Sequence, residues 1–259
     1  MRIFRGFDNL PLFKKGVATM GSFDGLHGGH LELLRRVKMV AKECRGESIV
    51  LTFEPHPRYV LGTGDGLYLL STLEEKLYLL EQAGIDNVII IPFTIEFSKT
   101  SREEFISRNI AAIGIETLVV GYNHRFGHNK QGDYSFLESQ GSSLKIHLVE
   151  QQQMQQSKVS STIVRNTIEQ GDMQHATKLL SHPYIIICSV NDMGQADGIE
   201  PTKLLPPKGQ YSVTIAGKQA QMEITEQRAL RIIDWKAEGV DGDKVIIEVN
   251  NANIIQLWH

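Results

Sequence analysis

The sequence has few of the residues that mark exported or thiol-dependent proteins. It contains only two cysteines, Cys44 and Cys188, which lie far apart and form no CxxC pair. Neither a disulfide framework nor a thiolate zinc site is therefore expected, which fits a reducing cytoplasm. No apolar run approaches the roughly 20 residues needed to cross a bilayer, and the opening MRIFRGFDNLPLFKKG lacks a continuous apolar signal segment. We expect a cytoplasmic protein that does not associate with membranes.

The sequence also lacks a large excess of charge of one sign, and it lacks two common nucleotide-binding motifs. The formal net charge of -3 argues against a protein that coats nucleic acid, although it leaves room for a basic patch around a phosphate site. The pattern G-x-x-x-x-G-K-[ST] does not occur, and the glycine spacing does not fit G-x-G-x-x-G. A P-loop enzyme and an ordinary dinucleotide-binding domain are therefore not indicated.

Short apolar runs alternate with helix-like segments from Val17 to about Leu180. The helix-like segment HLELLRRVKMVAKEC has an apolar face, and SREEFISRNIAAIG opens with a capping-box pattern from Ser101 to Glu104 and ends at Gly114. A third helix, TLEEKLYLLEQAG, is expected to end at Gly84. The runs expected as strands are VATMG, ESIVLTF, NVIIIPF, TLVVG and LKIHLV. This alternation predicts an α/β domain, residues 1–183, with a Rossmann-like, doubly wound parallel sheet covered on both faces.

The helical period stops near Pro183. Five β-branched or alternating runs follow at short spacing, separated by Gly, Pro and Asp: YIIICSV, GQYSVTIAG, KQAQMEI, ALRIIDW and KVIIEV. Residues 184–259 are therefore expected to form a small all-β domain, a barrel or a sandwich.

The stretch GSFDGLHGGH, residues 21–30, joins the first expected strand to the first expected helix. Ligands of doubly wound sheets bind beyond the carboxyl ends of the strands, where such loops lie. Glycines allow close approach of the backbone, and a helix N-terminus presents free N–H groups that suit phosphate. His27 and His30 add hydrogen-bond donors, which can stabilise charge during phosphoryl transfer.

Two other interpretations of this stretch remain open. His27 and His30 could bind a metal ion, but no third and fourth ligand is evident nearby, and zinc normally requires them. A purely structural turn would explain the glycines and not both histidines. No metal site is therefore assigned.

Several motifs resemble one enzyme family in the same order along the chain. GSFDGLHGGH resembles the GxFDGxHxGH signature of HxGH nucleotidyltransferases. TFEPHPR, VVGYNHRFGHNKQGD and VSSTIVRNTIEQGDMQHATKLLSHPY resemble later motifs of the bacterial bifunctional riboflavin kinase/FMN adenylyltransferase family, also called FAD synthetase. The resemblance covers most of residues 10–184.

This resemblance implies a role for each matching residue. His27, His30 and Arg165 would be catalytic, stabilising the transition state as the FMN phosphate attacks the α-phosphorus of ATP. Asp24 would orient the loop or help to hold magnesium, although an ordinary turn-stabilising aspartate is an alternative. The residues expected to bind ATP and its phosphates are Gly21, Ser22, Phe23, Asp24, Gly29, Ser160, Ser161 and Thr162. Taken alone, the serines before the helix would be an N-cap.

A second group of residues is implied to border the flavin. Its members are Phe53, Pro55, His56, Pro57, Arg58 and Asn123. His124 departs from the family, which usually has phenylalanine there, and this puts the shape of the flavin pocket in doubt. From the residues alone, His56 would be an exposed loop histidine. The substrates implied are FMN and ATP, with Mg²⁺ accompanying ATP.

The second domain resembles a riboflavin kinase barrel that lacks its catalytic residues. The family's GFPTAN motif is reduced to GIEPTKL, in which no asparagine appears. When Asp234 is aligned with the aspartate of a late strand, Ala229 stands where the family has its catalytic glutamate, and alanine cannot act as a general base. We expect a non-catalytic barrel that packs, stabilises or mediates association, including homo-oligomerisation.

The expected function is FMN adenylyl transfer, which gives FAD and pyrophosphate, with riboflavin kinase activity lost. Two alternatives remain: a non-catalytic protein that binds a flavin or a nucleotide, and an adenylyltransferase that uses another acceptor. The intact His27, His30, Ser161 and Arg165 favour an enzyme over the first alternative.

Overall fold

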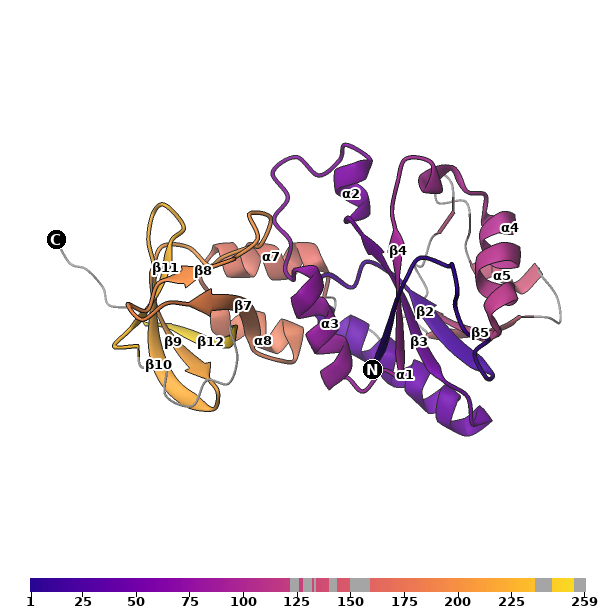
Figure 1. Cartoon of the computed structure of the whole chain (residues 1–259), viewed down its shortest axis with the longest axis horizontal. Helices are drawn as coiled ribbons and strands as arrows, with labels where there is room; N and C mark the ends of the chain where they lie inside the picture. Colours follow the sequence, from indigo (N-terminus) through magenta and orange to yellow (C-terminus); the bar gives the residue numbers. More distant parts are fainter. Residues whose placement is uncertain are drawn as a thin grey trace. The chain divides into compact units, whose positions relative to one another are not determined.

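The chain forms two compact units, which we call unit 1 and unit 2 (Figure 1). The computed structural model describes residues 1–121, 126–127, 132, 134–139, 144–149, 159–235 and 244–253. Unit 1 comprises Met1–Phe23, Gly29–Gly66 and Leu77–Lys158, and unit 2 comprises Asp24–Gly28, Leu67–Lys76 and Val159–His259. Two short segments from the first half of the chain therefore belong to the second unit.

Unit 1 contains a six-stranded parallel sheet in the order β1-β4-β3-β2-β5-β6. Its strands are β1 (Arg2–Arg5), β2 (Gly16–Met20), β3 (Ser48–Glu54), β4 (Asn87–Pro92), β5 (Ile115–Gly121) and β6 (Lys145–Val149). The five strands expected from the sequence are all present. Strand β1 is an addition, because four residues that begin and end with arginine give no apolar run to recognise.

Both faces of the middle of this sheet are buried. Every residue of β2 is buried, and so is every residue of β4 except Pro92, which is the pattern of a sheet covered on both sides. On one face, Ala18 and Met20 belong to a core that includes residues of the helical segment 102–113 and of α5 (Tyr134–Ser139). Right-handed crossover places α1 (Gly28–Cys44), which joins β2 to β3, on the other face. The doubly wound parallel sheet is thus confirmed.

The remaining helices of the first half are short. They are α2 (Pro57–Val60), α3 (Leu73–Gln82) and α4 (Arg102–Glu104). The single helix expected from Ser101 to Gly114 begins with α4 and continues as a π-helical segment, Phe105–Ile110, and a 3₁₀ turn. The hydrogen bonds of a π-helix join residues five apart, and Phe105 and Ile110, which have this separation, both lie in the same core. Both expected ends are correct, since Ser101 Oγ accepts from Glu104 N and Gly114 has φ 81°.

Unit 2 contains a six-stranded antiparallel sheet in the order β11-β10-β9-β12-β7-β8. Its strands are β7 (Tyr184–Val190), β8 (Ala196–Asp197), β9 (Gly209–Ile215), β10 (Lys218–Ile224), β11 (Leu230–Ile233) and β12 (Val245–Asn253). A bridge between Gln195 and Arg231 and a hydrogen bond from Ile232 N to Gly194 O join the two ends of the sheet. The expected small barrel is therefore confirmed.

Two helices share the core of this barrel. They are α7 (Ser161–Glu169) and α8 (Met173–Leu180), and Val164, Ile168 and Leu180 lie in one cluster with the inward-facing barrel residues. The compact units divide this part of the chain at Val159. The domain boundary expected at residue 183, where the character of the sequence changes, stays a prediction. None of the helices in the described ranges is long and apolar enough to cross a membrane.

Candidate active site

The loop after β2 leaves the sheet at the point where the strand order reverses. The chain passes from β2 to β3 in one direction and from β5 to β6 in the other, so the reversal lies between β2 and β5. Ligands of open α/β sheets bind beyond the carboxyl ends of the strands at such a point. Gly21 and Ser22 begin the loop there, and Gly21 N donates to Leu51 O in the middle of β3.

The loop has an unusual backbone that glycine makes possible. It contains a 3₁₀ turn, Asp24–Leu26, in which Gly25 has φ 79°. Phe23 and Leu26 also have positive φ, and both are completely buried, which compensates for the strain. A Cβ atom on Gly25 would lie 2.7 Å from Leu70 Cδ1. Backbone conformation and close packing therefore both require glycine at position 25.

Asp24 holds the loop in unit 2 through contacts with two other segments. Its Oδ2 accepts from Arg165 Nη2 at 2.6 Å, and its Oδ1 accepts from Ser71 N at 3.1 Å. The Ser161 hydroxyl donates to the backbone oxygen of Asp24 at 3.0 Å, and Arg165 Nε donates to Tyr68 O. The carboxylate is only 3 % exposed and both its oxygens have protein partners. This arrangement favours loop orientation as the role of Asp24.

His27 is buried and electrically neutral. Burial lowers its pKa from 6.5 to about 4, and the nearby Asp24 carboxylate, which raises the pKa, only partly offsets this effect. At neutral pH the ring therefore carries one N–H and no charge. His30 lies in the first turn of α1, is half-buried, and meets the Phe23 ring edge-on at 5.2 Å. Helix α1 begins at Gly28, so the N–H groups of its first turn follow His27 directly.

The predicted phosphate-binding serines have the structure of a helix start. Ser160 is the N-cap of α7, and its Oγ accepts from Ile163 N at 3.3 Å, as expected from these residues alone. Ser161 contacts Asp24, and Thr162 is exposed. Within unit 2 the structure thus brings Ser161 and Arg165 to the loop that carries His27, although nearly 140 residues separate them in sequence.

The predicted flavin residues follow β3 in unit 1. The Phe53 ring contacts Phe93 and Phe97, with ring centres 5.5 and 6.3 Å away. His56 is 9 % exposed, and its Nδ1 accepts from Arg58 N, so it caps α2. The interpretation of His56 as an exposed loop histidine is therefore wrong, because Pro57 starts a helix that needs this cap.

The other members of this group lie on the surface or outside the described residues. Pro55 and Arg58 are exposed, and Arg58 Nε donates to Thr63 O. Asn123 and His124 fall outside the described part of the chain. The structure describes the strand before them, β5, up to Gly121 at the carboxyl edge of the sheet.

A family model described as FAD synthetase matches residues 11–163. The chain belongs to the FAD synthetase family. It is 31 % identical over 170 residues to a bifunctional riboflavin kinase/FMN adenylyltransferase of Listeria monocytogenes, covering 65 % of this chain and 54 % of that protein. It is also 30 % identical to the Escherichia coli K12 protein of the same description, covering 84 % of this chain and 74 % of the relative. The chain thus spans about half the length of the first of these relatives.

A solved structure has the same fold over nearly the whole chain. The crystal structure of a macrolide-efflux protein from Streptococcus pneumoniae superposes with a TM-score of 0.80 and covers 97 % of this chain and 99 % of that one. The sequence identity is 21 %, so this likeness concerns the fold alone. Membership of the FAD synthetase family makes the chain a nucleotidyltransferase.

Three residues at this loop were not found from the sequence. The backbone oxygen of Tyr68 accepts from Arg165, the backbone N–H of Ser71 donates to Asp24, and the ring of His182 contacts the backbone oxygen of Gly25. Tyr68 and Ser71 lie in a segment without a recognisable motif, and His182 lies near the end of a matching motif without an implied role. Only the structure reveals them, because it shows that they lie close to Asp24, Gly25 and Arg165.

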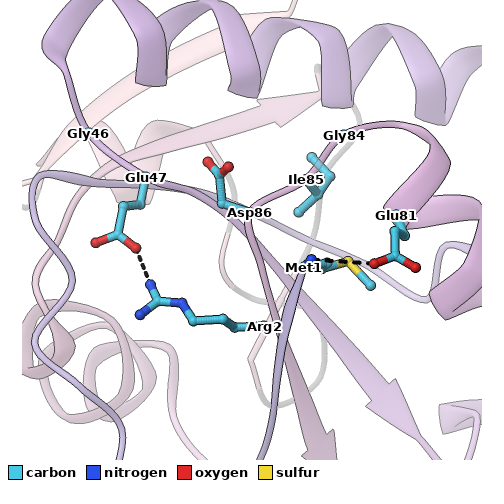
Figure 2. Close-up of a pocket in the computed structure, with 8 residues that line it drawn as sticks. All are labelled: Met1, Arg2, Gly46, Glu47, Glu81, Gly84, Ile85 and Asp86. Carbon is cyan, nitrogen blue, oxygen red and sulfur yellow. Dashed lines mark hydrogen bonds and ion pairs between the residues drawn. The ribbon is translucent and has the colours of Figure 1, made fainter.

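A hollow of about 540 Å³ lies in another part of unit 1 (Figure 2). Arg2, Glu47 and Asp86, which line it, stand at or just before the first residues of β1, β3 and β4. Because the strands are parallel, these positions share the amino edge of the sheet. Arg2 pairs with Glu47, and Asp86 accepts from Ser48. The hollow is therefore separate from the loop at the carboxyl edge.

Proposed function

We propose that this FAD synthetase transfers the adenylyl group of ATP to FMN and does not phosphorylate riboflavin. One observation carries the assignment of the site. Asp24 binds both Ser161 and Arg165, and so fixes the start of α7 beside the loop that carries His27. A helix N-terminus, hydroxyl groups and a guanidinium are then gathered where a polyphosphate requires them.

The reaction is a displacement at the α-phosphorus of ATP. A phosphate oxygen of FMN forms a bond to this phosphorus, the bond to the bridging oxygen breaks, and pyrophosphate leaves with the electron pair. Catalysis of such a step depends mainly on positioning and on stabilising charge. His27, as a neutral donor, and His30, in the first turn of α1, would donate hydrogen bonds to the phosphoryl oxygens. The N–H groups of Gly29 and its neighbours would add to them.

Arg165 would bind the leaving pyrophosphate. In the free protein its guanidinium uses donors on Asp24 and Tyr68, which leaves further N–H groups of the five for a phosphate. Ser160 and Thr162 would supply hydroxyl and backbone contacts to the same group. Gly21, Ser22 and Phe23 would line the nucleotide, since they begin the loop at the carboxyl edge of the sheet.

The flavin would be bordered by the residues that follow β3. Phe53 offers an aromatic face, Pro55, His56, Pro57 and Arg58 would shape the rim, and Asn123 would also contact the flavin. His56 would act through the turn that it caps. These roles come from the resemblance in sequence and await substitution experiments.

Mg²⁺ would accompany ATP. Across the described ranges, no group of three or more His, Cys, Asp and Glu side chains is placed to hold a metal ion. Mg²⁺ bound to nucleotides keeps several waters and takes most of its remaining ligands from the phosphates. The ion would therefore be bound together with the nucleotide. Cytoplasmic location and self-association stay predictions.

The barrel of unit 2 would lack kinase activity. Lys203, in the altered GIEPTKL motif, is fully buried, and its Nζ donates to Glu75 Oε2, Leu70 O and Ile185 O. The ammonium group of Lys203 therefore binds other groups of the protein itself. Ala229 offers no base for the ribityl hydroxyl. The boundary proposed at residue 183 separates this non-catalytic barrel from the transferase sequence.

The test is an assay with two acceptors. Purified protein is incubated with ATP, Mg²⁺ and either FMN or riboflavin, and the products are separated by chromatography. We expect FAD and pyrophosphate from FMN, and no FMN from riboflavin. Phosphorylation of riboflavin at a rate comparable to FAD synthesis would contradict the assignment of the barrel. Binding of FMN and ATP without turnover would favour a non-catalytic flavin-binding protein.

A further inference from the structure

The carbonyl group of Gly25 lies within hydrogen-bond distance of a histidine that is not among the predicted site residues. His182 Nε2 lies 3.1 Å from Gly25 O, and Nδ1 of the same ring lies 2.7 Å from Pro183 O. Both residues belong to unit 2. A neutral imidazole has a single N–H and can serve only one of these oxygens at a time.

His182 stands on a rigid support. The residue before it, Ser181, ends α8 in the left-handed conformation with φ 65°, and its N–H donates to Thr177 O. Pro183 follows, with its ring-fixed φ, and Tyr184 is the first residue of β7 and is bonded through its hydroxyl to Leu204 O. A side chain carried by such a turn loses little further conformational entropy when it forms a hydrogen bond.

The peptide groups on both sides of Gly25 are held by side chains from different segments. The Ser71 hydroxyl accepts from Gly25 N at 3.0 Å, and the ring of His182 contacts Gly25 O. Gly25 lies two residues before His27, within a turn whose positive φ values are costly unless the surroundings enforce them. The position of His27 thus depends on these two contacts.

We propose that His182 is a positioning residue for adenylyl transfer, which donates from Nε2 to the Gly25 carbonyl and so holds His27 in its buried place. This role rests on the proposed function of His27. Burial lowers the pKa of His182, so the ring is neutral near pH 7 and adds no positive charge beside His27.

The experiment compares side chains that keep different donors. Glutamine places its amide nitrogen near the position of histidine Nε2, asparagine places it near Nδ1, and leucine has no donor. The variants are His182→Gln, His182→Asn and His182→Leu. His175→Gln is the matched control, because His175 is exposed on α8, the helix that His182 follows. Two quantities are measured: kcat and KM for FAD synthesis, and the pKa of the His27 ring by NMR.

His182→Asn and His182→Leu should lower kcat by ~10- to 100-fold with little change in KM for FMN, because misplacing a catalytic group by about 1 Å can cost 10²-fold. In both variants the pKa of His27 should rise from about 4 toward 6.5, as the loop opens to water. His182→Gln should stay within about threefold of the wild type and keep the low pKa. His175→Gln should match the wild type.

Each other outcome has a defined meaning. Equal behaviour of the Gln and Asn variants, or rescue by Asn alone, overturns the proposal, and this comparison remains decisive if the Leu variant does not fold. If the wild type makes no FAD, the proposed function fails. The His27 pKa in the same variants then still tests whether His182 positions the loop.

Discussion

At the scale of single residues, His27 combines burial with the part in the reaction that we propose for it. A neutral ring that is 6 % exposed can be held in one orientation, and it donates its N–H without first losing a shell of water. His30 is less buried and leans against Phe23. Two donors of different exposure therefore occupy one loop and the first turn of the helix that follows.

Replacing either histidine should remove most of the activity. His27→Ala and His30→Ala are each expected to lower kcat for FAD synthesis by ~100- to 1,000-fold, the usual effect of losing one well-placed donor to the transition state. Steady-state kinetics with FMN and ATP measures this loss, and circular dichroism checks the fold. Wild-type turnover in a folded variant would remove that histidine from the site.

The low pKa of His27 also predicts how stability depends on pH. The unfolded chain binds a proton at His27 below about pH 6.5, and the folded chain does so only below about pH 4. Between these values the unfolded state holds more protons, so stability falls as the pH falls. His27 should cost roughly 2–3 kcal/mol of stability between pH 7 and pH 4.5.

His27→Gln removes this titration and keeps a polar side chain of similar size. Urea unfolding of both proteins at pH 7 and pH 4.5 gives the comparison. We expect the wild type to lose more stability on acidification than the variant by about that amount. Identical losses in the two proteins would show that His27 is not buried in its neutral form.

At the scale of elements, replacing Gly25 tests whether the loop between β2 and α1 needs its observed backbone conformation and close packing. Gly25 and Gly62 have similar positive φ values, 79° and 65°, but a Cβ on Gly62 would meet nothing within 4 Å, whereas one on Gly25 would overlap Leu70. Both alanine variants carry the cost of positive φ, about 1–2 kcal/mol. Only Gly25→Ala adds the overlap.

We therefore expect Gly25→Ala to be less stable than Gly62→Ala by a further 1–3 kcal/mol or so, the usual cost of overpacking, and to synthesise FAD more slowly. Gly62→Ala should keep wild-type turnover. Urea unfolding and initial rates of the two variants measure these differences. Equal rates would mean that the turn tolerates displacement.

Elements with a strong period were predictable, and contacts between distant segments were not. Strands β2 to β6 and helix α1 could be predicted because continuous or periodic burial leaves a recognisable pattern in the sequence. Strand β1 is too short for that. The motif residues His27, Ser161 and Arg165 could be named from resemblance, but the contact of Arg165 with Asp24 spans 141 residues and leaves no periodic signal.

The same limit explains the error at His56. A histidine between two prolines looks like part of an exposed loop, since proline interrupts both helices and strands. In the structure Pro57 begins α2, and the ring of His56 turns inward to cap it. The local sequence therefore predicts a turn at His56, but it does not predict that the His56 side chain is buried.

At the scale of the whole molecule, the chain does not fold as two halves in succession. Residues 67–76 belong to unit 2, where Leu69 pairs with Lys203 and the carboxylate of Glu75 is buried. Glu75 Oε1 accepts from Ile187 N, and Oε2 accepts from Lys203 Nζ at 2.6 Å. This buried ion pair fastens a segment from the first half of the chain to the barrel.

Removing one partner of this pair should lower the free energy of unfolding far more than removing both charges. Lys203→Met leaves the Glu75 carboxylate buried without its cation, which typically costs 3–5 kcal/mol or so. Adding Glu75→Gln removes the buried charge and keeps an acceptor for Ile187 N, so the double variant should recover much of the loss. Lys244 and Glu74 form an exposed pair in the same unit, and Lys244→Met should leave the urea midpoint unchanged. Urea unfolding of the four proteins completes the comparison. A double variant no more stable than Lys203→Met would show that the lysine acts through its packing on Tyr184, 4.1 Å from the ring centre, and not through its charge.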